Sequence, residues 1–167
     1  MEITFKKAAK ADIELLLQVL KGAAQKISKK GVDHWQYWID PPIEKISWVK
    51  EGIENGEYFF MSHRGDPLGI IRIMDQDLVY WSASQNRERA KYIHSLVIFE
   101  AHNGKGIGQK VIDAVASLAR KEGCLYLRLD CDANNSKLCQ YYEKQGFTKV
   151  MTKRFPYSIN KLYEREA

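Results

Sequence analysis

The chain has 167 residues, of which 45% are hydrophobic and 28% are charged, and this composition is typical of a single globular domain. No stretch approaches the roughly 20 consecutive apolar residues of a membrane span, and the first residues lack the apolar core of a signal peptide. We therefore expect one domain over residues 1–167, located in the cytoplasm and without a membrane partner. The three cysteines lack CxxC spacing, which argues against a disulfide framework or a zinc site.

Basic residues outnumber acidic ones by 26 to 21, for a net charge of +5. The lysines are scattered, and their densest group, Lys21, Lys26, Lys29 and Lys30, is typical of a solvated helix face. A modest positive field would also steer a small polyanionic ligand toward the protein. We expect no nucleic-acid partner.

The first third of the chain predicts one strand and two helices. Residues 3–5 alternate as a short strand does, and apolar residues then recur at helical spacing over 13–27. Residues 31–42 form a predicted loop rich in aromatic side chains. A second helix is predicted over 43–55, with Gly56 as its stop.

The middle of the chain changes to strand patterns. Residues 58–62 and 68–74 flank a turn sequence, Arg64-Gly65-Asp66-Pro67, and predict an antiparallel hairpin. In the polar segment that follows, Leu78–Trp81 could extend the sheet. Residues 92–99 are almost continuously apolar, which indicates a central strand covered on both faces.

The last third of the chain alternates two helices with three strands. The order of elements, β-α-α-β-β-β-α-β-α-β-β, predicts an α/β fold with helices on both faces of one mixed sheet. An exposed edge strand near Tyr157–Tyr163 could pair two copies into a homodimer. The elements predicted here are a helix over 107–122, a strand over 125–129, a helix over 135–145, and strands over 147–155 and 157–163.

A glycine-rich loop, Asn103-Gly104-Lys105-Gly106-Ile107-Gly108, lies between the strand over 92–99 and the helix that follows. Glycines let the backbone turn sharply and approach a ligand closely, and the first N–H groups of the helix present the positive end of its dipole. The loop therefore predicts a site for a phosphate or pyrophosphate. Lys105, Gln109 and Lys110 could reach the phosphates, although each also fits a solvated surface.

Together with the order of elements, three sequence blocks resemble the GCN5-related N-acetyltransferase (GNAT) superfamily. They have the family's order and spacing across residues 92–147, while residues 1–91 match only in their sequence of elements. The blocks are Leu96-Val97-Ile98 with Asn103-x-x-Gly106-x-Gly108, then Leu127-x-Leu129-Asp130, then Asn135-x-x-Leu138 with Tyr141-Tyr142-Glu143-Lys144-x-Gly146-Phe147.

The resemblance implies the acyl-CoA N-acyltransferase fold, a single mixed, mostly antiparallel central sheet with a splayed strand pair and helices on both faces. It also implies that acetyl-CoA donates an acetyl group to a primary amine of a small molecule, by direct attack in a ternary complex and without a metal. The family usually has Gln or Arg where this chain has Asn103, which we expect to weaken one contact. The residues expected to bind acetyl-CoA are Leu96, Val97, Ile98, Asn103, Gly104, Lys105, Gly106, Ile107, Gly108, Gln109, Asn135 and Tyr142.

Two residues are candidates for proton transfer. Tyr142 corresponds to the family's usual general acid, although a tyrosine on an amphipathic helix can also simply pack in the core; its neighbour Tyr141 is assigned to packing. His94 matches a position where arylalkylamine-type members carry a histidine in a proton pathway, and it would be the general base. A satisfied, partly buried histidine is the equal alternative, and carboxylates could replace it as the base: Glu100, Asp130 or Asp132.

The acceptor is expected near the loop over 31–42, because the equivalent loop borders the acceptor site in the superfamily. Trp35 and Trp38 could hold an amine by cation–π contact, while Asp33 or Asp40 supplies negative charge. Both tryptophans could equally fill the core, as we expect of Trp48 and Trp81, which lie outside this loop. A peptide or protein N-terminal or lysine acetyltransferase is the alternative enzyme, and a non-catalytic CoA-binding module is the alternative from another class.

Overall fold

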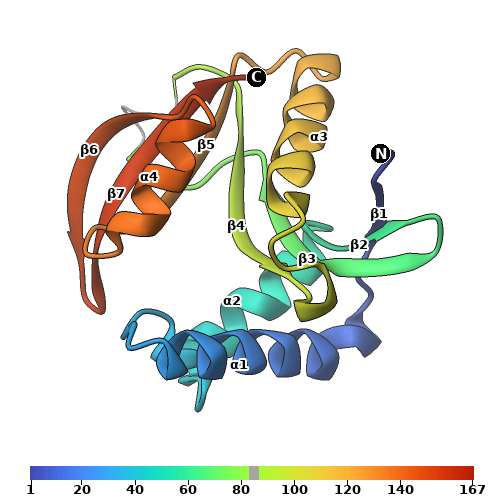
Figure 1. Cartoon of the computed structure of the whole chain (residues 1–167), viewed down its shortest axis with the longest axis vertical. Coiled ribbons are helices and arrows are strands. Elements are labelled where there is room, and N and C mark those ends of the chain that lie inside the picture. Colours follow the sequence, from blue (N-terminus) through green and yellow to red (C-terminus); the bar gives the residue numbers. More distant parts are fainter. Residues whose placement is uncertain (83–86) are drawn as a thin grey trace. The chain divides into compact units, whose positions relative to one another are not determined.

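The computed structural model describes residues 1–82 and 87–167. Its elements follow the predicted order, and Figure 1 traces them along the chain. They are β1 (Thr4–Lys7), α1 (Ile13–Lys29), α2 (Ile43–Glu54), β2 (Tyr58–His63), β3 (Asp66–Met74), β4 (Ala90–Ile98), α3 (Ile107–Lys121), β5 (Tyr126–Asp132), α4 (Ser136–Lys144), β6 (Thr148–Phe155) and β7 (Ser158–Glu166).

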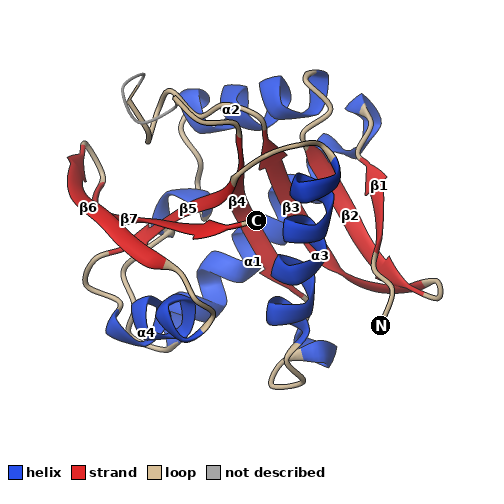
Figure 2. Ribbon diagram, turned by 90° about the horizontal axis from the view of Figure 1, so that it is seen from above, coloured by secondary structure: helices blue, strands red, loops and turns tan. Residues whose placement is uncertain are grey.

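The strands form one sheet with the order β1-β2-β3-β4-β5-β7-β6 (Figure 2). The pairs β1 with β2, β2 with β3, β5 with β7 and β6 with β7 are antiparallel, whereas β4 and β5 are parallel. The parallel ladder joins Ala90–Ile93 to Tyr126–Leu129, in the first part of each strand. The expected α/β fold with a single mixed, mostly antiparallel sheet is thus confirmed.

The chain folds as two compact units. The boundary between the units falls within β3, after Arg72, and within β4, after His94. The first unit contains Met1–Arg72 and Ser95–Ile107, and the second contains Ile73–His94 and Gly108–Ala167. The single domain over residues 1–167 remains a prediction, and each unit is described by itself below.

In the first unit, α1 and α2 pack on the hairpin of β2 and β3. Leu16, Leu20 and Ala24 recur at helical spacing on α1 and are completely buried. They join residues of α2, β2 and β3 in one apolar cluster, because these elements can remove their hydrophobic faces from water only against one another. The other members of the cluster are Ala8, Trp38, Val49, Ile53, Tyr58 and Ile70.

A buried hydroxyl in this core predicts sensitivity to alkali. Burial raises the pKa of Tyr58 to about 12, although hydrogen bonding to Ser95, whose Oγ lies 3.2 Å from the Tyr58 Oη, partly opposes the shift. In the unfolded chain the phenol ionises near pH 10. The contribution of the buried phenol to stability is therefore complete below about pH 10. It is lost as the pH rises through the pKa of Tyr58 in the folded protein, about 12.

We expect the free energy of unfolding of the wild-type protein to fall between about pH 10 and pH 12, by about 2 to 3 kcal/mol more than that of Tyr58→Phe. Urea titrations of both proteins at several pH values would measure this difference. Parallel declines in the two proteins would contradict it.

In the second unit, β5 has one apolar and one polar face. Leu127, Leu129 and Cys131 are buried, and the Cys131 Sγ lies 3.8 Å from the Cys139 Sγ of α4. Arg128 and Asp130 point to the opposite face, because successive residues of a strand alternate. Arg128 on the polar face is also buried. It donates from Nη1 to the hydroxyl of Tyr92 at 2.8 Å, and β5 can keep its charge there because the guanidinium forms an ion pair with Glu164 at 3.1 Å.

Two sequence predictions are wrong. Leu78–Trp81 does not extend the sheet but forms part of a turn. In this turn the side chain of Asp77 accepts hydrogen bonds from the backbone N–H groups of Val79 and Tyr80. The run near Tyr157–Tyr163 isn't an edge strand, because β7 pairs with β5 on one side and β6 on the other. The edge strand is β6, whose residues are mostly exposed. A homodimer remains a prediction.

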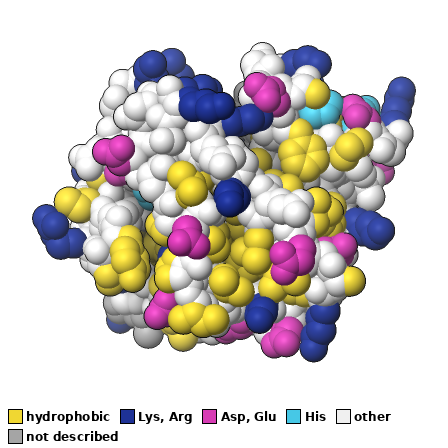
Figure 3. Space-filling model, turned by 90° about the horizontal axis from the view of Figure 1, so that it is seen from below, with side chains coloured by type: hydrophobic (Ala, Val, Ile, Leu, Met, Phe, Trp, Pro, Cys, Tyr) yellow, Lys and Arg dark blue, Asp and Glu magenta, His cyan; other side chains and the backbone are white. Residues whose placement is uncertain are grey.

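Charged side chains lie on the surface, and the cysteines lie in the interior. On the face seen in Figure 3, lysine and arginine side chains are interspersed with acidic and hydrophobic ones, as on an ordinary solvated surface. Cys124, Cys131 and Cys139 are buried free thiols. Over residues 1–82 and 87–167, no helix has the length and apolar character needed to cross a membrane.

Candidate active site

A residue with a left-handed φ lies in the middle of β4. Ser95 has a φ of 51°, which is uncommon for a residue other than glycine and costs of order 1–3 kcal/mol. Its side chain is buried and contacts the hydroxyl of Tyr58. Such conformations cluster at functional sites, and this one directly precedes the predicted cofactor-binding strand Leu96–Ile98, whose residues are half-buried.

Gly69 of β3 allows the backbone of β4 to come very close. It has a φ of 152°, and an added Cβ would overlap the carbonyl oxygen of Val97. Just beyond, the N–H of Phe99 donates to the carbonyl of Leu68 at 2.8 Å. The end of β4 is therefore held by backbone contacts to β3 within the first unit.

The glycine-rich loop has the predicted context, since it follows β4 and leads into α3 at Ile107. Gly104 and Gly106 have φ values of 73° and 69°, and an added Cβ at either would meet no atom within 4 Å. Asn103, Lys105 and Gln109 are exposed. Open backbone of this kind at a helix N-terminus suits an anion, so these residues fit a cofactor pyrophosphate.

Within the second unit, Gly108 brings α3 close to α4. A Cβ at this position would lie 2.6 Å from the hydroxyl oxygen of Tyr141, a separation that real Cβ atoms do not tolerate. Tyr141 is 39% exposed, so its ring packs at the surface. A larger residue at position 108 would therefore require the Tyr141 side chain to shift.

Asn135 begins α4 as its N-cap. Its Oδ1 accepts the backbone N–H of Leu138 at 3.1 Å, which satisfies one of the free donors of the first turn. Asn135 therefore caps the helix, a role that asparagine often has. This role employs the amide oxygen and is compatible with a cofactor contact through the amide nitrogen.

Tyr142 lies on α4 with its ring packed against Phe147 and Tyr163, at centroid distances of 5.8 and 6.4 Å. Burial, and after it the nearby Cys131 thiol, raise the pKa of the phenol above its ordinary value. Tyr142 therefore holds its proton throughout the neutral range. This is the state that a proton donor requires.

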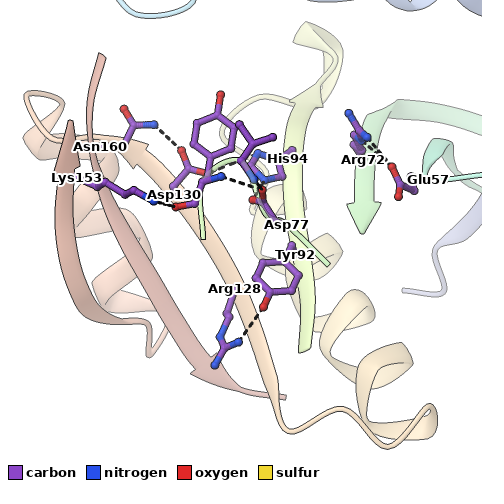
Figure 4. Close-up of polar contacts among 11 residues, drawn as sticks. Glu57, Arg72, Asp77, Tyr92, His94, Arg128, Asp130, Lys153 and Asn160 are labelled. Carbon is purple, nitrogen blue, oxygen red and sulfur yellow. Dashed lines mark hydrogen bonds and ion pairs between the residues drawn. The ribbon is translucent and has the colours of Figure 1, made fainter. Parts of the chain in front are cut away.

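His94 lies between two aspartates in the second unit (Figure 4). Its Nε2 is 2.6 Å from Oδ2 of Asp77, and its Nδ1 is 3.5 Å from Oδ1 of Asp130. Asp130 in turn accepts a hydrogen bond from Asn160, whose Nδ2 lies 2.5 Å from Oδ2 of Asp130. The tilted ring of Tyr80 lies 5.0 Å from the imidazole, measured between ring centroids.

The same three side chains are a group that could hold a metal ion, since their donor atoms lie within 4.8 Å of one another. However, the 2.6 Å contact between His94 and Asp77 has the length of a charge-assisted hydrogen bond. A hydrogen-bonded chain thus accounts for the arrangement, and we assign no metal to it.

Sequence reasoning missed Asp77. It lies in a polar segment without periodicity, where one more aspartate carries no signal. Its side chain is 1% exposed in the structure. Burial alone would raise the pKa of this carboxyl, but the hydrogen bond and charge of His94, with the backbone N–H groups of Tyr80 and Val79, lower it below its usual value.

The residues of the loop over 31–42 that are predicted to contact the acceptor lie in different environments. Trp38 is 3% exposed and belongs to the core cluster, whereas Trp35 is half-buried at the edge of that cluster. Trp35 also has a left-handed φ of 70°. Asp33 is exposed, and Lys45 lies 4.3 Å from the ring centroid of Tyr37.

The chain is similar to known acetyltransferases. The sequence model of the acetyltransferase (GNAT) family matches residues 30–147, which is well over half of the chain. A thialysine N-epsilon-acetyltransferase from Bos taurus is 31% identical over 86 residues, equal to 52% of this chain and 50% of that protein. The match thus spans about half the length of this relative.

Solved structures show the same fold. A GNAT-family acetyltransferase from Listeria monocytogenes has a TM-score of 0.78 and 20% identity, over 100% of this chain and 96% of its own. An aminoglycoside acetyltransferase in complex with coenzyme A has a TM-score of 0.67 and 18% identity, over 99% of this chain and 95% of its own.

Proposed function

Because the chain belongs to the acetyltransferase (GNAT) family, we propose that it transfers an acetyl group from acetyl-CoA to a primary amine of a small molecule, by direct attack in a ternary complex. The observation that carries this proposal is the exposed glycine-rich loop between β4 and α3, with left-handed Gly104 and Gly106. When bound, acetyl-CoA supplies the activated thioester. The protein binds and orients the two substrates, and its side chains accept and donate protons.

We assign cofactor binding to backbone groups of the first unit and to residues of α3 and α4. The loop residues Asn103–Gln109 would hold the pyrophosphate through N–H groups. Leu96, Val97 and Ile98 would hold the pantetheine arm through their backbone, with the N–H of Ile98 or its neighbour as a donor to the developing oxyanion. Asn135 would bind the same arm. The coenzyme A in the complex of the aminoglycoside acetyltransferase supports acetyl-CoA as the donor.

The proton transfers would be shared between two residues of the second unit. Tyr142 would protonate the departing sulfur, since its phenol, whose pKa is raised by burial, carries its proton at neutral pH. His94 would remove the proton of the ammonium group, so that the amine attacks as a neutral nucleophile. Among the other bases considered, Glu100 is exposed and forms a 2.7 Å ion pair with Lys26, and Asp132 caps the turn at Asn134.

For the acceptor we propose Trp35 and Asp33 as contacts, with Trp38 supporting them from the core. An exposed carboxylate and a partly exposed indole suit a cationic amine. The names of relatives that act on thialysine and on aminoglycosides support a small amine. A peptide or protein amine is the alternative acceptor.

The test is release of free CoA thiol when acetyl-CoA is mixed with a panel of amines. The panel contains polyamines, arylalkylamines, aminoglycosides, free amino acids with thialysine among them, and short peptides. Turnover with a small amine is expected. Turnover with peptides alone would favour the alternative acceptor, and binding of CoA without turnover on any amine would favour a non-catalytic CoA-binding module.

Gly106→Ala should weaken CoA binding about tenfold, because a left-handed alanine costs roughly 1–2 kcal/mol and the backbone would relax away from its binding conformation. Gly123→Ala is the matched control, since Gly123 has a similar φ of 74° but lies at the other end of α3. Calorimetric Kd values for CoA would compare the two. Equal Kd values in both variants and the wild type would exclude the loop from the binding site.

A further inference from the structure

We propose that Tyr58 is a positioning residue for the proposed cofactor strand, Leu96–Ile98: its hydroxyl holds Ser95 in the left-handed conformation and thereby fixes the backbone that follows. The part of this proposal that concerns acetyl-CoA rests on the proposed function, in which Leu96–Ile98 hold the pantetheine arm. The structural part stands on contacts within the first unit, which contains all of these residues.

The backbone of Ser95 needs a tertiary contact to keep its conformation. Its φ of 51° lies in the left-handed region, which a residue with a Cβ seldom adopts and which persists only where the surrounding structure enforces it. Ser95 is buried, and its Oγ lies 3.2 Å from the Oη of Tyr58, where either hydroxyl can donate a hydrogen bond to the other. This hydrogen bond joins the left-handed residue of β4 to the first residue of β2.

Tyr58 is a rigid partner for Ser95. Its side chain is completely buried, and its ring meets the ring of Trp48 edge-to-face at a centroid distance of 6.2 Å. The guanidinium of Arg72 lies 5.6 Å from the centroid of the Tyr58 ring and is anchored by two hydrogen bonds to Glu57 (Figure 4). Gly52 leaves so little room that an added Cβ would lie 2.8 Å from Cε2 of the ring. A ring packed this closely cannot follow Ser95 if the serine moves.

The proposed cofactor strand lies between two fixed points. At its start, left-handed backbone such as that of Ser95 bends a strand and re-aims the groups that follow it. Further along, the carbonyl of Val97 lies so close to Gly69 that a Cβ there would overlap it, and the N–H of Phe99 donates to a carbonyl of β3. A change of conformation at Ser95 would therefore move the peptide groups of Leu96–Ile98 relative to β3.

Two substitutions of Ser95 separate the effect of the hydroxyl from that of the conformation. Ser95→Ala removes the hydroxyl but keeps the Cβ, which disfavours the left-handed region. Ser95→Gly removes the same hydroxyl, but glycine adopts positive φ values about as readily as negative ones. Because the hydrogen bond acts by holding the backbone, alanine should weaken cofactor binding and glycine should be tolerated.

We expect Tyr58→Phe and Ser95→Ala each to raise the calorimetric Kd for CoA about fivefold, the scale of one buried hydrogen bond, and the double variant to be no worse. Ser95→Gly should stay within about twofold of the wild type, and Tyr58→Phe should have no further effect when it is combined with Ser95→Gly. Tyr92→Phe is the matched control, because it also removes a buried hydroxyl, which accepts from Arg128 at 2.8 Å in the second unit. The control should bind CoA as tightly as the wild type.

The conformation of Ser95 can be read without CoA, from NMR of the free, isotope-labelled protein. At a φ of 51° the amide and α protons of one residue are almost eclipsed, which gives a strong cross-peak between them, whereas in an extended strand they point apart. The wild type should show the strong cross-peak for Ser95, whose signal is identified by its loss in Ser95→Ala. In Tyr58→Phe the cross-peak should lose most of its intensity, since binding that is about fivefold weaker corresponds to a binding-competent fraction of about one fifth.

The two measurements separate the proposal from the proposed function. If the wild type binds no CoA, the proposed function fails, and the cross-peak still decides whether Tyr58 holds Ser95. The proposal is overturned if Tyr58→Phe keeps the wild-type cross-peak, or if it loses the cross-peak but binds CoA as tightly as the wild type. Equal weakening by Ser95→Ala and Ser95→Gly would also overturn it, because the hydroxyl of Ser95 and not its backbone conformation would then determine binding.

Discussion

Replacing Tyr142 with phenylalanine should lower kcat by a factor of about 100 or more, because the leaving sulfur loses its proton donor. The packing should survive, since phenylalanine keeps the ring contacts with Phe147 and Tyr163. The Kd for acetyl-CoA is expected to stay close to that of the wild type. Steady-state kinetics with saturating amine, together with calorimetric binding of CoA, would measure both quantities.

The pH dependence gives the same prediction a second test. Burial raises the pKa of Tyr142, so the wild-type phenol remains protonated across the neutral range and well into alkali. Its ionisation should therefore not reduce kcat at any pH below about 10, the usual value for a phenol. An earlier loss of rate, absent from the Tyr142→Phe variant, would show that this environment does not hold the proton.

Tyr141→Phe is the matched control, because it removes a hydroxyl from the neighbouring residue of the same helix. Tyr141 is 39% exposed and is expected only to pack, so its variant should retain most of the activity. If Tyr142→Phe turns over as fast as the control, Tyr142 is not the general acid and α4 contributes only packing and the Asn135 cap.

Gly69→Ala should have the largest effect on stability, about 2 to 4 kcal/mol. The new methyl group would overlap the carbonyl oxygen of Val97, and backbone in a sheet cannot move aside as the end of a flexible side chain can. For a chain of this length we expect the Tm to fall by roughly 4–16 °C. Thermal and urea unfolding would measure the loss.

The same substitution should weaken acetyl-CoA binding, since the proposed cofactor strand Leu96–Ile98 would be pushed away from β3. Gly65→Ala separates this effect from backbone strain. Gly65 also has a positive φ, 85°, but an added Cβ there meets no atom within 4 Å. The control should lose about 1 kcal/mol and bind CoA normally. Equal losses of stability at Gly65 and Gly69 would refute the clash with Val97.

Most of the fold was predictable because its elements carry strong local patterns. The apolar spacing on α1, at Leu16, Leu20 and Ala24, and the nearly continuous apolar run of β4 gave their types and approximate bounds. The turn residues Arg64–Pro67 predicted the hairpin of β2 and β3. The pattern failed at Leu78–Trp81, since four apolar or aromatic residues look alike in a strand and in a turn held by an aspartate.

Part of the candidate site was predictable for a similar reason. The glycine-rich loop, Asn135 and Tyr142 lie at family spacings along a short stretch of chain, so their identities and order indicated their roles before any coordinates were known. Their binding and catalytic roles remain predictions. Trp38 could not be separated from Trp35 by sequence, because both are aromatic residues of one loop, yet Trp38 is 3% exposed and Trp35 is half-buried.

The sequence by itself determined the order of elements, the family blocks and the loop at the start of α3, since each depends on residues that are neighbours along the chain. Only the tertiary structure decided that β6 rather than β7 is the edge strand, that Gly69 meets Val97, and that Asp77 meets His94. These contacts join segments that are far apart in sequence or lie in stretches without periodicity. Their free energy depends on pairing and burial, which local residue patterns do not encode.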